Sequence, residues 1–198
     1  MLNTKEKKTT LDRDLKRIVQ LEKATAIVGR TNLNLGFGLL FLLGVWLFVF
    51  FQAGGQETFS ILAIAAIVGG YMAMNIGAND VANNVGPAVG SKALTIVGAL
   101  AIAAIFEAAG ALIAGGDVVT TISKGIIDPD SFPDPGLFVW AMLSALLAAA
   151  VWVNLATYIG APVSTTHSIV GGVMGAGIAS AGLSTVDWAV MSKIAASW

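Results

Sequence analysis

Uncharged, apolar stretches long enough to cross a membrane recur along the chain. Crossing a hydrocarbon core of about 30 Å takes roughly 20 apolar residues. Residues 31–56 carry no charge, and positions 35–51 within them predict a first membrane-spanning helix. A second uncharged run covers residues 58–79, and a third span is predicted at residues 93–115. The pattern therefore predicts an all-α, polytopic membrane protein built as a helical bundle.

Two uncharged regions do not have the pattern of a regular helix. The second run becomes polar and glycine-rich at its end, in NIGANDVANNVGP, which predicts a broken transmembrane helix. Residues 137–158 fill another crossing, but residues 160–177 then combine Pro162 with closely spaced glycines. Non-helical backbone at membrane depth is tolerated only where protein or a water-filled cavity surrounds it. We therefore expect a re-entrant helical hairpin there instead of a smooth helix.

The remaining segments are predicted from their small and charged residues. The third span is rich in Ala and Gly, which let membrane helices approach closely, so we expect it inside the bundle. Residues 117–136 gather charges and three prolines and predict an aqueous loop. Asp187 and Lys193 flank the start of a further segment.

Charge sets the expected orientation. Only 12% of the residues are charged and 56% are hydrophobic, whereas a soluble domain carries about twice that charged fraction. Eight of the 11 Lys and Arg residues lie in residues 1–30, which predicts a cytoplasmic amino terminus in the cell membrane. This basic segment either lies on anionic lipid or only sets the topology. Nucleic acid is not an expected partner, and the absence of cysteine excludes thiol chemistry.

The polar end of the second run predicts a cation site. Asn75, Asn79 and Asn83 recur every four residues, and Asp80 lies among them, so a helix would gather carboxylate and amide oxygens on adjoining faces. A charged side chain at mid-membrane costs at least about 2.5 kcal/mol, and no basic residue lies between positions 30 and 92. Asp80 therefore needs a proton or a bound cation, unless it sits at an interface and the asparagines only join helices.

A second group of polar residues follows Pro162. Ser164, Thr165, Thr166 and Ser168 offer four hydroxyls, beside His167. At the start of a short helix, hydroxyls and free N–H groups suit an oxyanion. The alternative is that the hydroxyls bond carbonyl groups one turn back in a regular helix. We expect His167 to serve in packing or hydrogen bonding more than as a proton relay.

The charges of the two groups constrain each other. A phosphate dianion beside Asp80 would bring the local charge to about −3, so co-bound cations must offset the repulsion. That dependence of anion binding on cation binding is the coupling that a symporter requires. Glu107, midway along the third span, is equally consistent with a second cation or proton site and with a neutral acid bonded to a neighbouring helix.

At these positions the sequence resembles the inorganic phosphate transporter (PiT) family. Residues 77–95, GANDVANNVGPAVGSKALT, are similar to that family's signature, and PVSTTHS at 162–168 is similar to its hairpin-tip motif. The resemblance covers about residues 61–198 and implies secondary transport of phosphate, with the GAND form closer to sodium-coupled members. It implies phosphate binding by Asp80, Asn83, Ser164, Thr165 and Thr166. It implies cation binding, with Na⁺ as the coupling ion at Asn79 and Asp80, by Asn79, Asp80, Asn83 and, less directly, Glu107.

The chain departs from this family in two respects. Residues 31–56 add a helix and a short outer loop ahead of the signature. The family is built from two inverted repeats, whereas residues 57–198 contain one GAND-type and one Ser/Thr-type motif. We therefore interpret residues 57–198 as the first repeat of the transporter core, truncated at its carboxyl end, and expect the missing second repeat in the full-length chain. Transporters of this design place substrate between repeats.

Other functions remain open at this stage. One is proton-coupled uptake of metal phosphate or sulfate, since hydroxyl and amide donors do not select phosphate. Another is a non-transporting membrane subunit, and the sequence leaves open whether the chain pairs with a second copy. An intramembrane hydrolase using Ser164 or Ser168 with His167 is disfavoured, because neighbours on one backbone rarely make the required hydrogen bond. We therefore do not expect an enzyme.

Overall fold

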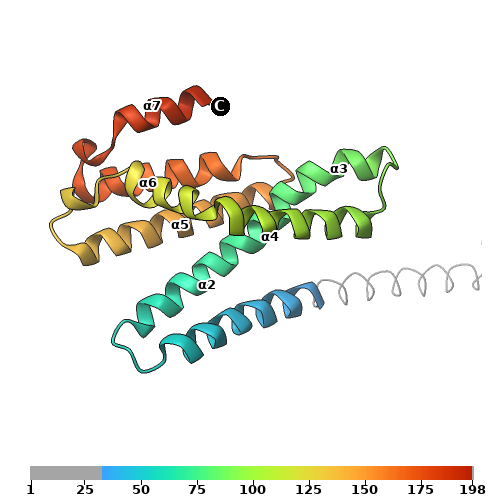
Figure 1. The fold of residues 1–198 in the computed structure, drawn as a ribbon, viewed down its shortest axis with the longest axis horizontal. Helices are drawn as coiled ribbons and strands as arrows, with labels where there is room; N and C mark the ends of the chain where they lie inside the picture. Colours follow the sequence, from blue (N-terminus) through green and yellow to red (C-terminus); the bar gives the residue numbers. More distant parts are fainter. Residues whose placement is uncertain (1–32, 198) are drawn as a thin grey trace, which may run out of the picture. The chain divides into compact units, whose positions relative to one another are not determined.

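The computed structural model of the protein describes residues 33–197, and the basic segment 1–30 lies outside them. Within residues 33–197 the chain is helical, and its one β-type contact is an isolated bridge between Ile127 and Val186 (Figure 1). Four helices in this range are long and apolar enough to cross a membrane: Leu33–Ala53, Phe59–Gly90, Ile96–Thr120 and Pro135–Tyr158. These helices confirm the predicted all-α membrane fold.

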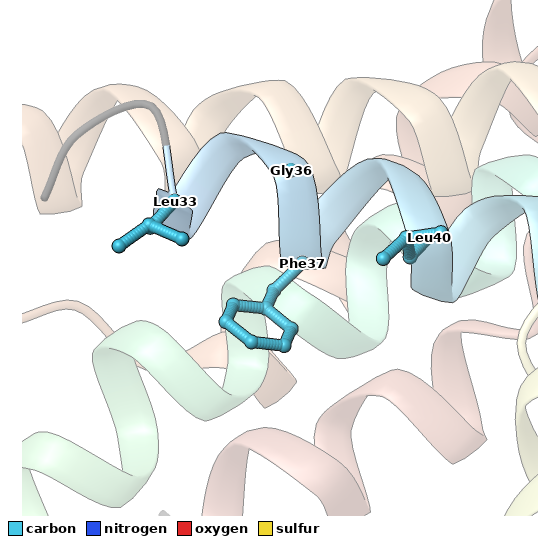
Figure 2. Close-up of a pocket in the computed structure, with 4 residues that line it drawn as sticks. All are labelled: Leu33, Gly36, Phe37 and Leu40. Carbon is cyan, nitrogen blue, oxygen red and sulfur yellow. The ribbon is translucent and has the colours of Figure 1, made fainter. Parts of the chain in front are cut away.

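The first described helix, Leu33–Ala53, matches the first predicted span. The chain divides within it, after Gly44, into two structural units. One face of the helix in the first unit carries a shallow recess of about 280 Å³ (Figure 2). The recess is lined by Leu33, Gly36, Phe37 and Leu40. Because all four residues are apolar and belong to successive turns of one helix, the recess offers no ligand to an ion.

An aromatic cluster orders the turn between this helix and α2 (Phe59–Ile76). The rings of Trp46 and Phe50 stack with their centroids 5.5 Å apart. Phe59 contacts both rings edge-on, at centroid distances of 6.4 Å and 5.9 Å. Gly55 closes the turn with φ at +93°, a conformation that glycine adopts freely. The short loop predicted at the end of residues 31–56 is therefore a compact turn.

The polar stretch after α2 does not unwind. α2 continues into a π-helical segment, η1 (Gly77–Val81), and then into α3 (Ala82–Gly90), so the helical run is unbroken from Phe59 to Gly90. π-helical turns are rare and occur frequently at functional sites. The break predicted in the second span is thus a local change of hydrogen-bonding pattern across GANDV, in a helix that stays continuous.

α4 (Ile96–Thr120) is longer and more exposed than the sequence predicts. It is capped by Thr95, whose hydroxyl accepts a hydrogen bond from the Gly98 amide at 3.2 Å. A second π-helical segment, η2 (Thr121–Gly125), prolongs it, so the predicted loop starts after residue 125 instead of at 117. Within α4 only Ala99 is buried. The expectation that this span is enclosed in a bundle is wrong for the described chain, since most of α4 is exposed and, apart from its continuation η2, its main neighbour is α3.

α5 (Pro135–Tyr158) and α6 (Thr165–Ala181) pack side by side as a helical hairpin (Figure 1). α5 faces α6 and α2 with small side chains, and a Cβ at Gly172 of α6 would lie 2.8 Å from the carbonyl oxygen of Ala145. Small residues therefore allow the two backbones to approach closely. The structure thus contains a helical hairpin, but α5 and α6 form it with its tip at residues 160–164, whereas the sequence predicted it within residues 160–177.

The glycine-rich part of α6 is a regular helix, which corrects the sequence-based expectation for residues 160–177. α6 runs without interruption through four glycines. Each glycine costs a helix about 1 kcal/mol relative to alanine. Two of them occupy places where a larger residue does not fit, because a Cβ at Gly177 would lie 2.6 Å from Ile127 Cγ2, and one at Gly172 would meet Ala145. Packing therefore offsets the low helix propensity.

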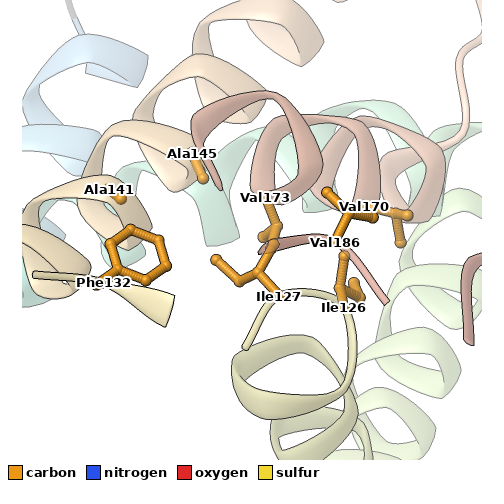
Figure 3. Close-up of a cluster of buried hydrophobic side chains, with 8 residues drawn as sticks. All are labelled: Ile126, Ile127, Phe132, Ala141, Ala145, Val170, Val173 and Val186. Atoms are coloured by element: carbon orange, nitrogen blue, oxygen red, sulfur yellow. The ribbon is translucent and has the colours of Figure 1, made fainter. Parts of the chain in front are cut away.

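A hydrophobic core closes the end of the hairpin opposite its tip. It joins α5 and α6 to the loop after η2 and to the segment before α7 (Figure 3). The buried members are Ile126, Ile127, Phe132, Ala141, Ala145, Val170, Val173 and Val186. Although residues 117–136 were expected to be aqueous, Ile126 and Ile127 are fully buried because they pack onto α6 and Val186.

Backbone and side-chain hydrogen bonds reinforce this core. The Asp128 amide donates to the Thr185 carbonyl at 2.9 Å, and the Asp187 amide donates to the Ile126 carbonyl at 2.9 Å. Thr185, in the short helix η4 (Leu183–Thr185), also donates its hydroxyl to Ser131, in η3 (Pro129–Ser131), at 3.0 Å. Asp187 then caps α7 (Trp188–Ser197). The chain thus returns after α6 to the end at which α5 begins.

Candidate functional site

The hairpin tip begins where α5 stops in a glycine-terminated cap. The Gly160 amide donates to the Thr157 carbonyl at 3.1 Å, and the Ala161 amide donates to the Ala156 carbonyl at 2.8 Å. This pair of bonds defines a Schellman motif, which requires a left-handed residue, and Gly160 has φ at +73°. The cap turns the chain sharply and leaves the Ala161 carbonyl directed toward η1, where Asn79 donates to it at 3.4 Å.

The other side of the tip is the amino-terminal end of α6. The Ser164 hydroxyl caps the helix by accepting a hydrogen bond from the His167 backbone amide at 3.2 Å. Ser168 donates its hydroxyl to the Ser164 carbonyl at 2.8 Å. Thr165 occupies the first helical position and is buried. The free amides and positive dipole end of α6 therefore lie at the tip, beside the buried threonine.

The π-helical segment packs against this tip. Thr165 donates its hydroxyl to the Asp80 carboxylate, Oγ1 to Oδ2, at 2.9 Å. Asn79, which is buried, donates its side-chain amide to the Thr157 hydroxyl at 3.1 Å as well as to the Ala161 carbonyl. The two polar groups that the sequence singles out, 85 residues apart along the chain, are thus in direct contact.

A small polar pocket opens next to Asn79. Asn83, one turn further along, donates its side-chain amide to the Asn79 side-chain oxygen at 3.2 Å. The pocket measures about 130 Å³, room for a partly hydrated ion or a few water molecules. Its polar side chains come from η1, α3 and the end of α5, and the tip adds backbone: Asn79, Asn83, Thr157, Gly160 and Ala161.

The charge of this region is one carboxylate among neutral donors and acceptors. Asp80 is half-buried, and its hydrogen-bond donor is a hydroxyl. Within the described part of the chain, no three acidic or histidine side chains cluster in the way that a transition metal would require. Amide, hydroxyl, carbonyl and carboxylate oxygens are instead the ligands of hard cations.

The other residues predicted from the sequence lie outside these contacts. Thr166 and His167 are exposed on the first turn of α6. Glu107 is exposed on α4, where it lines a separate recess of about 410 Å³ with Asn84 and apolar residues of α3 and α4. The structure therefore joins Asn79, Asp80 and Asn83 to the tip and leaves Glu107 apart from it.

Comparison with known proteins identifies the family. The chain matches the model of the phosphate transporter family over residues 76–198. It belongs to that family. It is 51% identical over 185 residues to the "Putative phosphate permease" of Helicobacter pylori (strain ATCC 700392 / 26695), which covers 93% of this chain and 35% of that protein. A similarly named protein of Thermococcus kodakarensis is 49% identical over 137 residues, or 69% of this chain and 34% of the relative.

A solved structure supports the fold. It is described as the sodium-dependent phosphate transporter, is 47% identical and superposes with a TM-score of 0.67. The likeness covers 70% of this chain and 34% of that one. The chain thus spans about a third of the length of the relatives that it matches.

The sequence pattern did not single out two polar side chains of α5 that bond to the neighbouring helical run. Asn154, on α5, donates its amide to the Asn75 side-chain oxygen at 2.9 Å. Thr157, on the same helix, accepts from Asn79 and donates to the Val153 carbonyl at 2.8 Å. Both residues lie in a span that hydropathy alone predicts, and hydropathy does not distinguish single polar residues. Their spacing of three residues, which places them on one helical face, was the available signal.

Proposed function

We propose that the chain forms part of a secondary active transporter for inorganic phosphate that is driven by symport with sodium ions. The contact that carries this proposal is the 2.9 Å hydrogen bond between Thr165 and Asp80. It joins the one carboxylate of the polar segment to the helix end that suits an oxyanion. Family membership and the sodium-dependent relative support the same function.

Each group has a proposed role. Asn79, Asp80 and Asn83 supply oxygen ligands to Na⁺, with Asn79 and Asp80 closest to the ion. Phosphate binds beside them, on the free amides of α6 and on the side chains of Asp80, Asn83, Ser164, Thr165 and Thr166. Glu107 remains a candidate for a second cation site, in its own recess.

Charge balance makes the two ligands interdependent. A dianion beside a charged Asp80 gives a local charge of about −3, and the donors found at the tip are neutral. Sodium bound at Asn79 and Asp80 would lower that repulsion, so phosphate affinity rises with sodium concentration. By linkage, phosphate raises the affinity for sodium by the same factor.

The complete transporter is proposed to be larger than this chain. The relatives are about three times as long as the part matched here, so further ligands can come from the rest of the transporter. We propose that residues 57–198 form one of two inverted repeats, preceded by an additional helix at 31–56, with the amino terminus in the cytoplasm. A proton-coupled permease for metal phosphate or sulfate, and a non-transporting subunit, are the competing functions.

The experiment that tests this proposal is Asp80→Asn in the intact transporter that contains this chain. The amide keeps the shape of the carboxylate and removes its charge, so binding of labelled phosphate should lose most of its dependence on sodium. Asp130→Asn is the matched control, because Asp130 lies in η3, in the loop beyond the opposite end of the hairpin. Unchanged sodium dependence in Asp80→Asn would refute the proposal. Binding that responds to protons, or displacement by sulfate, would favour a competing function.

A further inference from the structure

Asn75 is a buried polar side chain that the proposed binding site does not use. It is 4% exposed and lies in α2, one turn before the π-helical segment. Its amide nitrogen donates to the Tyr71 carbonyl at 2.9 Å, and its oxygen accepts from Asn154 of α5 at 2.9 Å. Both functional groups of the side chain are therefore occupied by protein, and Asn75 does not line the polar pocket at Asn79.

The bond between Asn75 of α2 and Asn154 is the first of two polar rungs that join the helical run 59–90 to α5. The second is the bond between Asn79, in the adjoining η1, and Thr157, one turn further along the chain. Two rungs a turn apart fix both the rotation of α2 and its position along α5. Only the second rung belongs to the pocket.

The apolar part of the same interface cannot fix the rotation as firmly. Around the rungs, α2 contacts α5 through Met72, Ala149, Ala150 and Val153. Alanine presents a smooth surface, and in lipid there is little hydrophobic driving force to hold one helix register against another. A rotation by one residue turns a helix by about 100°, which would carry Asn79 and Asp80 away from their present partners.

We propose that Asn154, acting through Asn75, is a positioning residue that holds Asn79 and Asp80 against the hairpin tip. This inference rests on the proposed function of that site. Asn154 touches neither ion in this scheme. It sets the rotation of α2, so that Asn79 faces the end of α5 and Asp80 faces the start of α6.

The test uses leucine, which has nearly the shape of asparagine, in the intact transporter. Asn75→Leu and Asn154→Leu should each weaken the apparent sodium affinity by about three- to tenfold, the range expected for interhelical hydrogen bonds in membranes. Each single variant leaves one amide without its partner and should therefore lower the thermal stability. The double variant removes both polar groups, so its thermal stability should recover relative to the single variants. Its sodium affinity should stay low, because the directional bond is still missing.

Controls separate positioning from general stability. Ser131→Ala removes the hydrogen bond to Thr185 in the distant core and should leave sodium affinity unchanged. Asn154→Gln keeps the amide but displaces it by one methylene, so it should also weaken sodium affinity. It takes the place of the leucine variants in the test if those do not fold.

Four results would overturn the inference. If the double variant regains both stability and sodium affinity, the pair is merely structural. If Asn154→Leu weakens binding and Asn75→Leu does not, Asn154 contacts a ligand directly. If Asp80→Asn abolishes sodium dependence while all the asparagine variants bind normally, the positioning role fails and the proposed function stands. An unaffected Asp80→Asn would instead refute the proposed function, and the positioning role with it.

Discussion

At the scale of single residues, the tip depends on side chains that serve two neighbours at once. Thr165 is the first residue of α6 and also the donor to Asp80. Asn79 joins α5, the tip and Asn83 through its amide and its oxygen. Each such side chain links a structural contact to one at the proposed binding site, so substitutions must be chosen to separate the two effects.

Thr165→Val is expected to weaken sodium-dependent phosphate binding, because valine keeps the branched shape and loses the hydroxyl bonded to Asp80. The loss should be about 1 to 3 kcal/mol of binding free energy, the usual cost of removing a partner from a charged group. Titration with labelled phosphate at fixed sodium measures it. Thr165→Ser restores the hydroxyl and should recover most of the affinity, and equal affinity in the serine and valine variants would contradict the role.

At the scale of elements, the hairpin is held by close backbone approach. A Cβ added at Gly172 would meet the Ala145 carbonyl, whereas one added at its neighbour Gly171 would find open space for 4 Å around it. Close packing thus excludes a side chain at Gly172 but leaves room for one at the adjacent Gly171. They form a matched pair for measuring what the close approach contributes.

Gly172→Ala is expected to lower the thermal stability of the intact transporter. The new methyl group would meet backbone at 2.8 Å, so α5 and α6 must separate, at a cost of about 1 to 3 kcal/mol. Gly171→Ala should be neutral or stabilising by up to about 1 kcal/mol, since alanine favours helix. Unfolding in detergent, followed by circular dichroism, compares them. Equal midpoints would show that the close approach is not needed.

The sequence predicted most elements to within a few residues and missed the contacts between them. The first span, expected at 35–51, is Leu33–Ala53, and the span at 137–158 is Pro135–Tyr158. Hydropathy and charge determine such spans locally. The continuity of α6 through its glycines, and the burial of Ile127, depend on partners far along the chain, such as Val186.

The same distinction applies to the candidate site. Asp80 and Thr165 stand out because polar residues are rare in an apolar chain, although their contact could be expected only from the family resemblance. Asn154 was overlooked because one polar residue barely changes the hydropathy of α5. Its importance depends on Asn75, its partner across 79 residues of sequence.

At the scale of the whole molecule, the hydrogen bond between Thr185 and Ser131 constrains topology. It places the end of α6 beside the start of α5, so the hairpin enters and leaves on one side. The connection between α3 and α4, around Ser91, follows the second span and precedes the third. If the amino terminus is cytoplasmic, the Ser91 connection faces the cytoplasm and the Ser131 loop faces outward.

Cysteine labelling tests this arrangement without background from residues 1–198, which contain no cysteine. Ser184→Cys should react with an impermeant maleimide in intact cells, since Ser184 is exposed beside the outer loop. Ser91→Cys, also exposed, should react only after the cells are opened. If only Ser91→Cys is labelled in intact cells, the chain has the opposite orientation in the membrane. Equal labelling of both variants would contradict the topology.

The π-helical segment η1 makes the number of residues in GANDV as important as their identity. A π turn holds one residue more than the α turn that it replaces. An in-frame deletion of one codon, such as that for Ala78, would convert the segment to ordinary α-helix and leave α2 and α3 roughly in phase, but it would turn Asn79 and Asp80 relative to those two helices. Asn79 and Asp80 would then no longer face Thr157 and Thr165. The compact turn at Gly55 tolerates a length change far better, so along this chain the effect of a deletion depends on helical phase.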